Sequence, residues 1–264
     1  MKVVFANMYQ GLLYEGKIDD RDVFSKFWPS VYLEQYAALE PDVLMLAEAP
    51  LDDARGRSRF VEELAQRMGA RSAHTDVHGE SWLVEGKYYG LAMLSRFELA
   101  DYRSIALGNP GLEIDLSDGT RGHMHLKTMQ FARIQAHGRD IKLFNLHYYP
   151  IWYFGGKLSA AKYAPLRREF VDSLALNEKE PVILAGDFNN GDGTLFQEVP
   201  ELFESGKLRS AVAFAKEDFD ERYVGGKYQL DHILYTPGQL AVSSGAVVRD
   251  RSDHHGIVAE IEVV

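Results

Sequence analysis

Short apolar runs, flanked by polar and turn residues, recur along the whole chain. The clearest are Val3–Ala6, Val43–Ala47, Ile141–Leu146, Val182–Ala185 and Ile257–Val263. Runs of this length that are rich in β-branched residues are typical of strands. A run without polar residues indicates a strand buried on both faces. Two sheets packed face to face would bury this many apolar strands, so packed β-sheets are predicted.

Helical periodicity appears between these runs, and further strands follow one another in the middle of the chain. The helical segments are Ser30–Leu39, Phe60–Met68 and Lys162–Leu176, and the middle strands are Leu91–Leu94, Leu99–Leu107, Leu112–Leu116 and His123–Gln135. Turn residues at 118–119 and 137–140 divide these strands into hairpins. Helix–strand units on both sides of a hairpin-rich middle predict an α/β fold with mixed sheets. Neither a repeat nor a change of composition divides the chain, so residues 1–264 are predicted to form one domain.

Composition limits the chemistry that the chain can carry. The chain has 264 residues, a net charge of −10 and no cysteine. Disulfides, thiolate nucleophiles and cysteine-based zinc sites are therefore excluded. The negative charge argues against a general nucleic-acid coat protein, which binds by neutralising phosphates. A bound divalent cation would still allow phosphate chemistry, because it adds positive charge that the residue count omits.

The sequence does not indicate membrane insertion or export. Its apolar runs all fall short of the roughly 18 residues of a membrane span. The N-terminal segment 1–7 is too short and too soon polar for a secretory signal. The cytoplasm is therefore the default expectation for the compartment.

Polar residues stand at the ends of most predicted strands. They are Asn7, Glu48, His147, Asp187, Asp231 and the pair Asp253-His254. One such residue usually only begins a loop. Glu48 is different because five apolar residues precede it and Ala49-Pro50 follows it. An unpaired carboxylate in such surroundings is costly, so Glu48 is predicted to lie near a cation.

The segment Gly186-Asp187-Phe188-Asn189 is the sharpest local signal. The glycine permits a tight turn and the close approach of a ligand. Asp187 and Asn189 flank Phe188, so they can point to one side while the ring packs on the other. A calcium loop starting at Asp187 is rejected, because its sixth position would be Asp192 where such loops need glycine.

Together these motifs resemble those of the endonuclease/exonuclease/phosphatase superfamily of metal-dependent phosphoesterases. The matching segments are 5–7, 41–48, 90–96, 145–147, 186–189, 230–234 and 252–255, in the order typical of that family. The resemblance spans residues 3–263 and implies a four-layer sandwich of two packed mixed β-sheets flanked by helices. Two positions depart from the family pattern. Ala47 stands where glutamine commonly precedes the metal-binding glutamate, and Gly256 stands where proline commonly follows the catalytic histidine.

The resemblance also implies catalytic roles. His254 would be the catalytic histidine, and Asp231 would fix its tautomer and favour its charged form. Asp187 would orient or deprotonate the attacking water, and Asn189 would hold that water or a phosphoryl oxygen. His147 would donate a hydrogen bond to a non-bridging phosphate oxygen. The division of acid and base between Asp187 and His254 stays open.

A metal site follows from the same resemblance. Glu48 would be the main metal ligand with Asn7 nearby, and Asp253 would be a further ligand or an acid beside the site. Oxygen donors favour Mg²⁺ or Mn²⁺. Schemes with one metal and with two metals both stay open.

The implied function is that of a divalent-metal-dependent phosphoester hydrolase. The net charge favours a small phosphodiester, a phosphomonoester or a single-stranded end over long duplex DNA. The expected enzyme is a phosphodiesterase that acts on a small or single-stranded phosphodiester. The alternatives are a DNA endo- or exonuclease, a phosphomonoesterase, a sphingomyelinase-like lipid phosphodiesterase and a non-catalytic binding module on the same fold. The expected partner is a phosphate ester, with nucleic acid among the candidates, and no protein partner is evident.

Candidate substrate contacts come mainly from an aromatic segment. Residues 148–154 follow His147 directly and contain five aromatic side chains. They would either pack on the core or form a platform for a base, a sugar or lipid. Tyr149 and Trp152 are therefore candidate substrate contacts, and Tyr89 and Arg168 complete the set.

Three further histidines are predicted to have no catalytic role. On a strand, His255 faces opposite to His254, so it is predicted to be structural. His123 and His125 alternate along a predicted strand without a third ligand in view, which favours a solvated strand face over a metal site.

Overall fold

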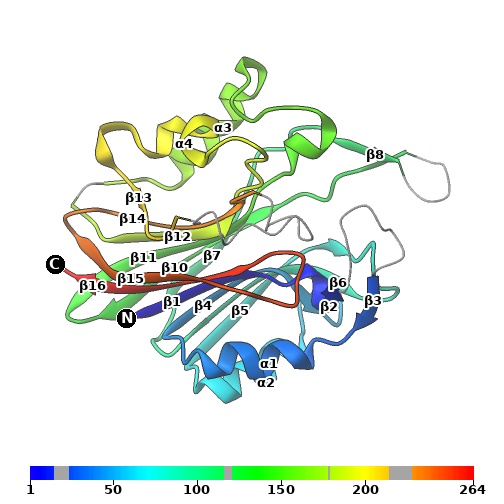
Figure 1. The fold of residues 1–264 in the computed structure, drawn as a ribbon, viewed down its shortest axis with the longest axis horizontal. Helices are drawn as coiled ribbons and strands as arrows, with labels where there is room; N and C mark the ends of the chain where they lie inside the picture. Colours follow the sequence, from blue (N-terminus) through cyan, green and yellow to red (C-terminus); the bar gives the residue numbers. More distant parts are fainter. Residues whose placement is uncertain (15–23, 116–120, 178, 214–227) are drawn as a thin grey trace.

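Two mixed β-sheets lie face to face in the computed structural model of the protein, which describes residues 1–14, 24–115, 121–177, 179–213 and 228–264 (Figure 1). In spatial order, the first sheet contains β15 (Leu240–Val248), β16 (Gly256–Val263), β1 (Lys2–Asn7), β4 (Val43–Leu51), β6 (Tyr88–Ser95) and β5 (Ser72–Glu80). The second contains β13 (Arg209–Ser210), β14 (Asp231–Tyr235), β12 (Val182–Asp187), β11 (Arg139–His147), β10 (Thr128–Ala136) and β7 (Ala100–Ala106).

Short hairpins and helices complete the fold. The hairpins pair β2 (Leu12–Tyr14) with β3 (Phe24–Phe27), and β8 (Glu113–Asp115) with β9 (Arg121–His123). The α-helices are α1 (Ser30–Ala38), α2 (Arg59–Met68), α3 (Ala164–Ser173) and α4 (Leu195–Glu198). Segments Tyr9–Gly11, Ile151–Phe154, Ala161–Tyr163, Pro200–Leu202 and Glu204–Gly206 are 3₁₀ turns. Within the described residues, none of the helices has the length and hydrophobicity of a membrane span.

The core is arranged in three apolar layers. Val3, Ile183 and Ile257 are among the fully buried side chains that fill the space between the sheets. Helices α1 and α2 cover the outer face of the first sheet, and α3 and α4 cover that of the second (Figure 1). The predicted four-layer α/β sandwich is therefore confirmed. Its layers follow from the apolar runs, because strands buried on both faces need cover on both faces.

Local signals explain the ends of α2. The Ser58 side chain accepts a hydrogen bond from the Val61 backbone N–H at 3.1 Å and caps the first turn. Gly69 ends the helix in the left-handed region, with φ of 65°. Glycine suits this position, since the left-handed conformation strains residues that carry a Cβ.

Some predicted elements have different bounds in the structure. The predicted strand His123–Gln135 is wrong, because residues 124–127 leave the sheet between β9 and β10. The predicted helix Lys162–Leu176 is shorter, since α3 begins at Ala164 after a 3₁₀ turn. Strand β5 was not predicted, because its sequence SAHTDVHGE lies at a sheet edge and lacks an apolar run. The predicted turn at 118–119 lies outside the described residues.

Two parallel strand pairs determine where the polar strand ends meet. Strand β1 runs parallel to β4, with Asn7 opposite Ala47, and β11 runs parallel to β12, with His147 opposite Asp187. Strand β14 is antiparallel to β12 and begins at Asp231, directly opposite Asp187. Both sheets therefore bring polar residues to the same end of the sandwich.

Asp250, beside this end, gives a pH-dependent stability prediction. The side chain is only 6% exposed, and burial raises its pKa from 3.8 to about 7. Between these two pKa values, Asp250 is ionised in the unfolded chain but protonated in the folded chain. The free energy of unfolding of the wild type therefore falls as pH rises through this range. Replacement by asparagine removes this titration. Asp250→Asn is expected to increase the free energy of unfolding by about 1–3 kcal/mol more at pH 8 than at pH 4.

Urea unfolding at the two pH values measures this difference. The exposed acid Glu262 on β16 supplies the control, and Glu262→Gln should change stability equally at both. An Asp250→Asn effect that does not grow with pH would show that the folded protein holds this carboxyl ionised.

Candidate active site

Asp187 lies at the centre of the polar residues that meet between the two sheets. Its Oδ2 accepts a hydrogen bond from Asn7 Nδ2 at 2.9 Å, which links β12 of one sheet to β1 of the other. Its Oδ1 accepts from the Asn189 backbone N–H at 2.9 Å. The Nε2 atoms of His147 and His254 lie 3.6 and 3.9 Å from Oδ2. Burial raises the pKa of Asp187 from 3.8 to about 6.

His254 and Asp231 form a buried pair. The Nδ1 atom of His254 lies 2.8 Å from Asp231 Oδ2, and Asp231 is fully buried. Burial alone would disfavour the imidazolium, but the carboxylates of Asp231, Asp253 and Asp187 outweigh it and raise the pKa of His254 well above 6.5. The pair thus holds Nδ1–H toward Asp231 and leaves Nε2 directed at Asp187.

Glu48 projects from a bulge in β4. Pairing between β4 and β6 shifts register between Leu46 and Ala49, and Glu48 has a φ of 49°. Positive φ is uncommon for a residue with a Cβ and recurs at functional sites. The bulge directs Glu48 Oε1 to within 3.7 Å of His147 Nε2. Burial raises the pKa of Glu48, although nearby Lys127 and His254 oppose the shift.

The carboxylates of the site fit a divalent cation. Burial raises the pKa of Glu48 and of Asp187, and it raises the pKa of Asp253 to about 7, so each ionised form needs nearby positive charge. Asp231 Oδ1 is buried and, among the described residues, has no hydrogen-bond partner. One ligand atom each from Asp187, Asp231 and His254 lies within 4.8 Å of the others. The two carboxylates of this group offer the oxygen ligands that hard cations prefer, whereas His254 in its charged form has no lone pair for a metal.

Comparison with known proteins identifies the family of the chain. The model of the Endonuclease/Exonuclease/phosphatase family matches residues 30–254. The chain belongs to this family. Among curated proteins there is no significant match.

Solved structures of the family share the fold at low sequence identity. A family member from Beutenbergia cavernae DSM 12333 superposes with a TM-score of 0.68 at 18% identity, covering 100% of this chain and 71% of that one. The human Nocturnin catalytic domain superposes with a TM-score of 0.64 at 21% sequence identity, and the match covers 100% of this chain and 93% of that domain. A mannosyl-6-phosphatase from Bacteroides thetaiotaomicron superposes with a TM-score of 0.61 at 18% sequence identity, and the match covers 99% of each chain. Identities this low establish the shared fold alone.

In the family pattern a glutamine commonly stands directly before the metal-binding glutamate. In this chain a glutamine from elsewhere in the sequence, Gln10, contacts Glu48. Ala47, at that adjacent position, is fully buried. Gln10 Nε2 donates to Glu48 Oε2 at 3.2 Å, and Ser81 Oγ donates to Gln10 Oε1 at 2.6 Å. Gln10 has a φ of 56° in its 3₁₀ turn. Sequence reasoning missed this residue, because only the fold brings residues 10 and 48 together.

Lys127 and His78 were also missed. Lys127 is 2% exposed and donates from Nζ to the Tyr148 carbonyl at 3.1 Å. Burial lowers its pKa to about 8 against the opposing carboxylates of Glu48 and Asp187. The His78 ring lies 6.1 Å from that of His147, and burial lowers its pKa to about 3. Burial also lowers the pKa of His147 well below 6.5, and repulsion from Lys127 and His78 adds to this shift. His147 is therefore neutral.

Asn145 bridges the two sheets at the bulge. It lies on β11, two residues before His147, and its Nδ2 is within 3.1 Å of three acceptors, Leu46 O, Ala92 O and Gln130 Oε1. The two carbonyls belong to β4 and β6, where the ladder is interrupted. Asn145 therefore satisfies backbone groups that the bulge would otherwise leave unpaired.

Replacement of Asn145 by alanine is expected to lower the free energy of unfolding by about 2–4 kcal/mol, because buried carbonyls lose their donor. Urea unfolding in EDTA measures the loss without any contribution from metal. The exposed Asn109 is the matched control, and Asn109→Ala should cost less than about 0.5 kcal/mol. A loss below about 1 kcal/mol for Asn145→Ala would show that water replaces the amide.

The predicted substrate contacts are dispersed. Tyr89 is 3% exposed, and its burial raises the pKa of its hydroxyl. The charge of Glu48 raises this pKa further, so Tyr89 lies beside the metal-ligand candidates. Trp152 is half-buried, and its Nε1 donates to Asn189 Oδ1 at 3.3 Å. Tyr149 is fully buried, and its hydroxyl accepts from the Lys127 backbone N–H. The Tyr149 ring therefore packs in the core, and its contact with substrate stays a prediction.

Arg168 lies apart from the other predicted site residues. It is exposed on α3, in a groove with Asp172, Glu201 and Lys207 that contains none of the catalytic candidates. The neighbouring residue Arg167 turns inward and pairs with Glu201 at 3.0 Å. The sequence shows two adjacent arginines but not which face of the helix carries the site.

The remaining predicted residues have the following surroundings. Asn189 is 7% exposed, and its Nδ2 donates to the Tyr148 carbonyl at 3.1 Å.

His255 is 2% exposed, in keeping with a structural residue. His123 is exposed, whereas the half-buried His125 packs on Trp82 with ring centroids 4.6 Å apart. The prediction of a solvated strand face therefore fails for His125, which follows the end of β9.

Proposed function

We propose that the protein is a divalent-metal-dependent phosphoester hydrolase that acts on a small phosphodiester by in-line attack of water. The observation that carries the proposal is the position of Asp187. This buried carboxylate lies among Asn7, His147 and the Asp231–His254 pair. Family membership supports the reaction class. The net charge of −10 supports a small substrate over long duplex DNA.

Asp187 is proposed as the general base. Burial raises its pKa to about 6, so it is ionised near neutral pH and yet basic enough to accept a proton from water. The Asn7 amide and the Asn189 backbone N–H hold its two oxygens in place. Asn189 is proposed to position the attacking water beside it.

The two histidines are proposed to act on the phosphate. His254, kept charged by Asp231, stabilises the developing negative charge and gives its Nε2 proton to the leaving oxygen. Neutral His147 donates a hydrogen bond from Nε2 to a non-bridging oxygen. Lys127, buried behind Glu48 and Asp187, adds positive charge to the site.

Glu48 and Asp253, with Asn7 beside them, are proposed to hold Mg²⁺ or Mn²⁺. The bound cation supplies charge neutralisation at the phosphoryl oxygens. Gln10 and the bulge hold the carboxylate of Glu48 for this purpose. Buried carboxylates with raised pKa values support the assignment, because a cation would compensate their burial.

Hydrolysis of three probes tests the proposal. They are bis-p-nitrophenyl phosphate, p-nitrophenyl phosphate and a short labelled single-stranded DNA, each with Mg²⁺, Mn²⁺ or EDTA. The expected result is metal-dependent hydrolysis that is fastest with the diester. Preference for the monoester would identify a phosphatase, and preference for DNA a nuclease. Metal binding without turnover of any phosphate ester would indicate the binding module and overturn the proposal.

A further inference from the structure

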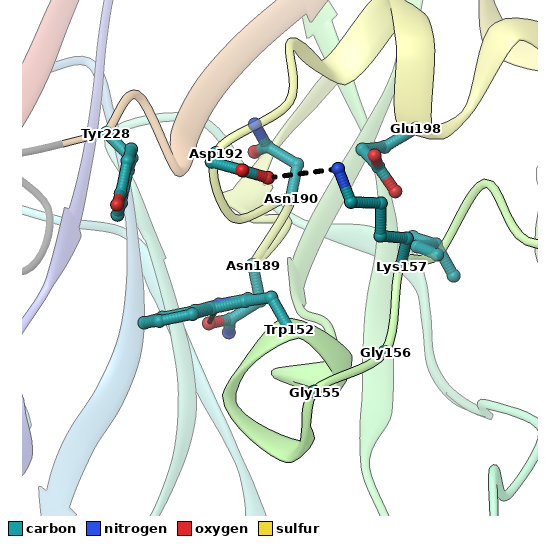
Figure 2. Close-up of a pocket in the computed structure, with 10 residues that line it drawn as sticks. Trp152, Gly155, Gly156, Lys157, Asn189, Asn190, Asp192, Glu198 and Tyr228 are labelled. Atoms are coloured by element: carbon teal, nitrogen blue, oxygen red, sulfur yellow. Dashed lines mark hydrogen bonds and ion pairs between the residues drawn. The ribbon is translucent and has the colours of Figure 1, made fainter.

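A pocket of about 280 Å³ lies beside the end of β12, where Asp187 stands (Figure 2). Its walls include Trp152, from the 3₁₀ turn after β11, and Asn189, from the loop after β12. Figure 2 shows the Trp152 ring against the Asn189 side chain. The aromatic segment and the loop that follows Asp187 therefore meet at this contact.

Two hydrogen bonds fix the orientation of the Asn189 amide. Trp152 Nε1 donates to Asn189 Oδ1 at 3.3 Å, and Asn189 Nδ2 donates to the Tyr148 carbonyl at 3.1 Å. The indole nitrogen can only donate, and the carbonyl can only accept. An exchange of the amide oxygen and nitrogen would break both contacts, so the two neighbours together select one orientation.

The selected orientation places an amide donor near the proposed base. Nδ2 of Asn189 carries two hydrogens, and the Tyr148 carbonyl is its one acceptor among the residues that the structure describes. The backbone N–H of Asn189 donates to Asp187 Oδ1 at 2.9 Å. A water beside Asp187 can then accept a hydrogen bond from the second Nδ2–H while it gives its proton to the carboxylate.

The loop that carries Asn189 packs closely on Trp152. Asn189 has a φ of 49°, a conformation that persists only where the surroundings hold it. Gly191 has a φ of 63°, and a Cβ on it would lie 2.7 Å from Trp152 Cβ. A side chain at position 191 would push the loop away from the tryptophan. Trp152 therefore bounds the position of the loop as well as that of the amide.

The turn that carries Trp152 is anchored in the core. Ile151, which precedes it, is 1% exposed, and Tyr149 is fully buried. The turn ends at Gly155, whose backbone N–H donates to the carbonyls of Ile151 and Trp152. The indole is thereby held in place, with its N–H directed at Asn189.

We propose that Trp152 is a positioning residue for the hydrolysis, whose indole N–H keeps the Asn189 amide turned so that Nδ2 holds the attacking water. Trp152 acts through Asn189 and does not touch the reacting atoms. Without the indole N–H, the amide can turn its oxygen toward the water, and the water then loses its donor. This inference rests on the proposed function, because that function assigns the water to Asp187 and Asn189.

Steady-state kinetics with bis-p-nitrophenyl phosphate and saturating Mg²⁺ measure the effect. Trp152→Phe keeps an apolar ring and removes the N–H, so kcat is expected to fall about tenfold while KM changes by less than about twofold. Asn189→Ala removes the group through which Trp152 acts. In that background, Trp152→Phe should lower kcat by less than about twofold, because the effects of two residues in one contact are not additive.

The matched control is Tyr153→Ala, because Tyr153 lies in the same turn, is 73% exposed and does not line the pocket. This variant should retain wild-type kcat. A loss of about tenfold from Trp152→Phe that persists in the Asn189→Ala background would show an effect independent of Asn189 and overturn the inference.

The indole ¹⁵N–¹H resonances supply a second measurement, which needs neither metal nor substrate. The chain has three tryptophans, and Trp152→Phe identifies the signal of Trp152. Asn189→Ala should move this signal upfield and speed its exchange with solvent, because the indole loses its acceptor. The signals of Trp28 and Trp82 should stay in place and show that the variant is folded. A Trp152 signal that does not move would overturn the inference.

The wild type separates failure of the inference from failure of the proposed function. If it hydrolyses none of the phosphate esters, the proposed function is contradicted and the inference is overturned with it. If it hydrolyses the diester and Trp152→Phe leaves kcat unchanged, the inference alone is overturned and the proposed function stands.

Discussion

Replacement of His254 by alanine is expected to lower kcat for bis-p-nitrophenyl phosphate by about 10³-fold, with a smaller change in KM. General acid catalysis contributes about 10²–10⁴-fold, and the charge on His254 also stabilises the transition state. The effect depends on the 2.8 Å contact with Asp231, which keeps the ring charged and oriented. Asp231→Asn should therefore lower kcat as well, although the ring remains in place.

The steady-state rates of both variants at saturating Mg²⁺ measure this effect. His123→Ala is the matched control, because His123 is exposed on β9 and should retain wild-type kcat. A loss of less than tenfold in His254→Ala would remove His254 from the chemical step and transfer the acid role to another group. Thermal unfolding of each variant shows whether a low rate reflects a folded enzyme.

Replacement of Glu48 by glutamine is expected to raise the Mg²⁺ concentration for half-maximal activity by about 10²-fold. The change keeps the shape of the side chain but removes the charge that attracts the cation. The same variant should be more stable than wild type in EDTA, because burial makes the ionised carboxylate unfavourable in the absence of metal. Activity and metal-free stability are thus predicted to change in opposite directions.

Thermal unfolding with and without Mg²⁺ tests both parts. Wild type should gain stability on adding metal, since a ligand that binds only the folded state stabilises it. Glu48→Gln should lose most of that gain, and Glu62→Gln, an exposed change on α2, should keep it. An unchanged metal response in Glu48→Gln would exclude Glu48 as the main ligand.

The sequence predicted the sandwich well because its signals are local. The apolar runs of β1, β4, β11 and β12 are buried strands, and the predicted helix Phe60–Met68 is α2. The polar residues that end neighbouring strands also come together, as the pairing of His147 on β11 with Asp187 on β12 illustrates. Parallel pairing brings the carboxyl ends of neighbouring strands to one edge, so residues distant in sequence become neighbours in space.

Orientation and burial within the site were harder to predict. Tyr149 and Arg168 both looked suitable for substrate contact, but one ring is in the core and the other side chain faces an outer groove. Neighbouring positions in a turn or helix differ in direction, and composition does not reveal which of them faces the cleft. Trp152, from the same aromatic run as Tyr149, is the residue that lines the pocket.

The amino-acid sequence by itself determined the strands, their polar ends and the family, because hydrophobic pattern and motif order are properties of the chain alone. Only the tertiary structure brought Gln10 to Glu48, Asn145 to the bulge and Lys127 to the carboxylates. Each of these contacts joins segments that are distant in sequence, and those of Asn145 and Lys127 also depend on how one sheet packs on the other. The pocket beside Asp187 has the same origin, since its walls come from separate loops that meet only in the folded protein.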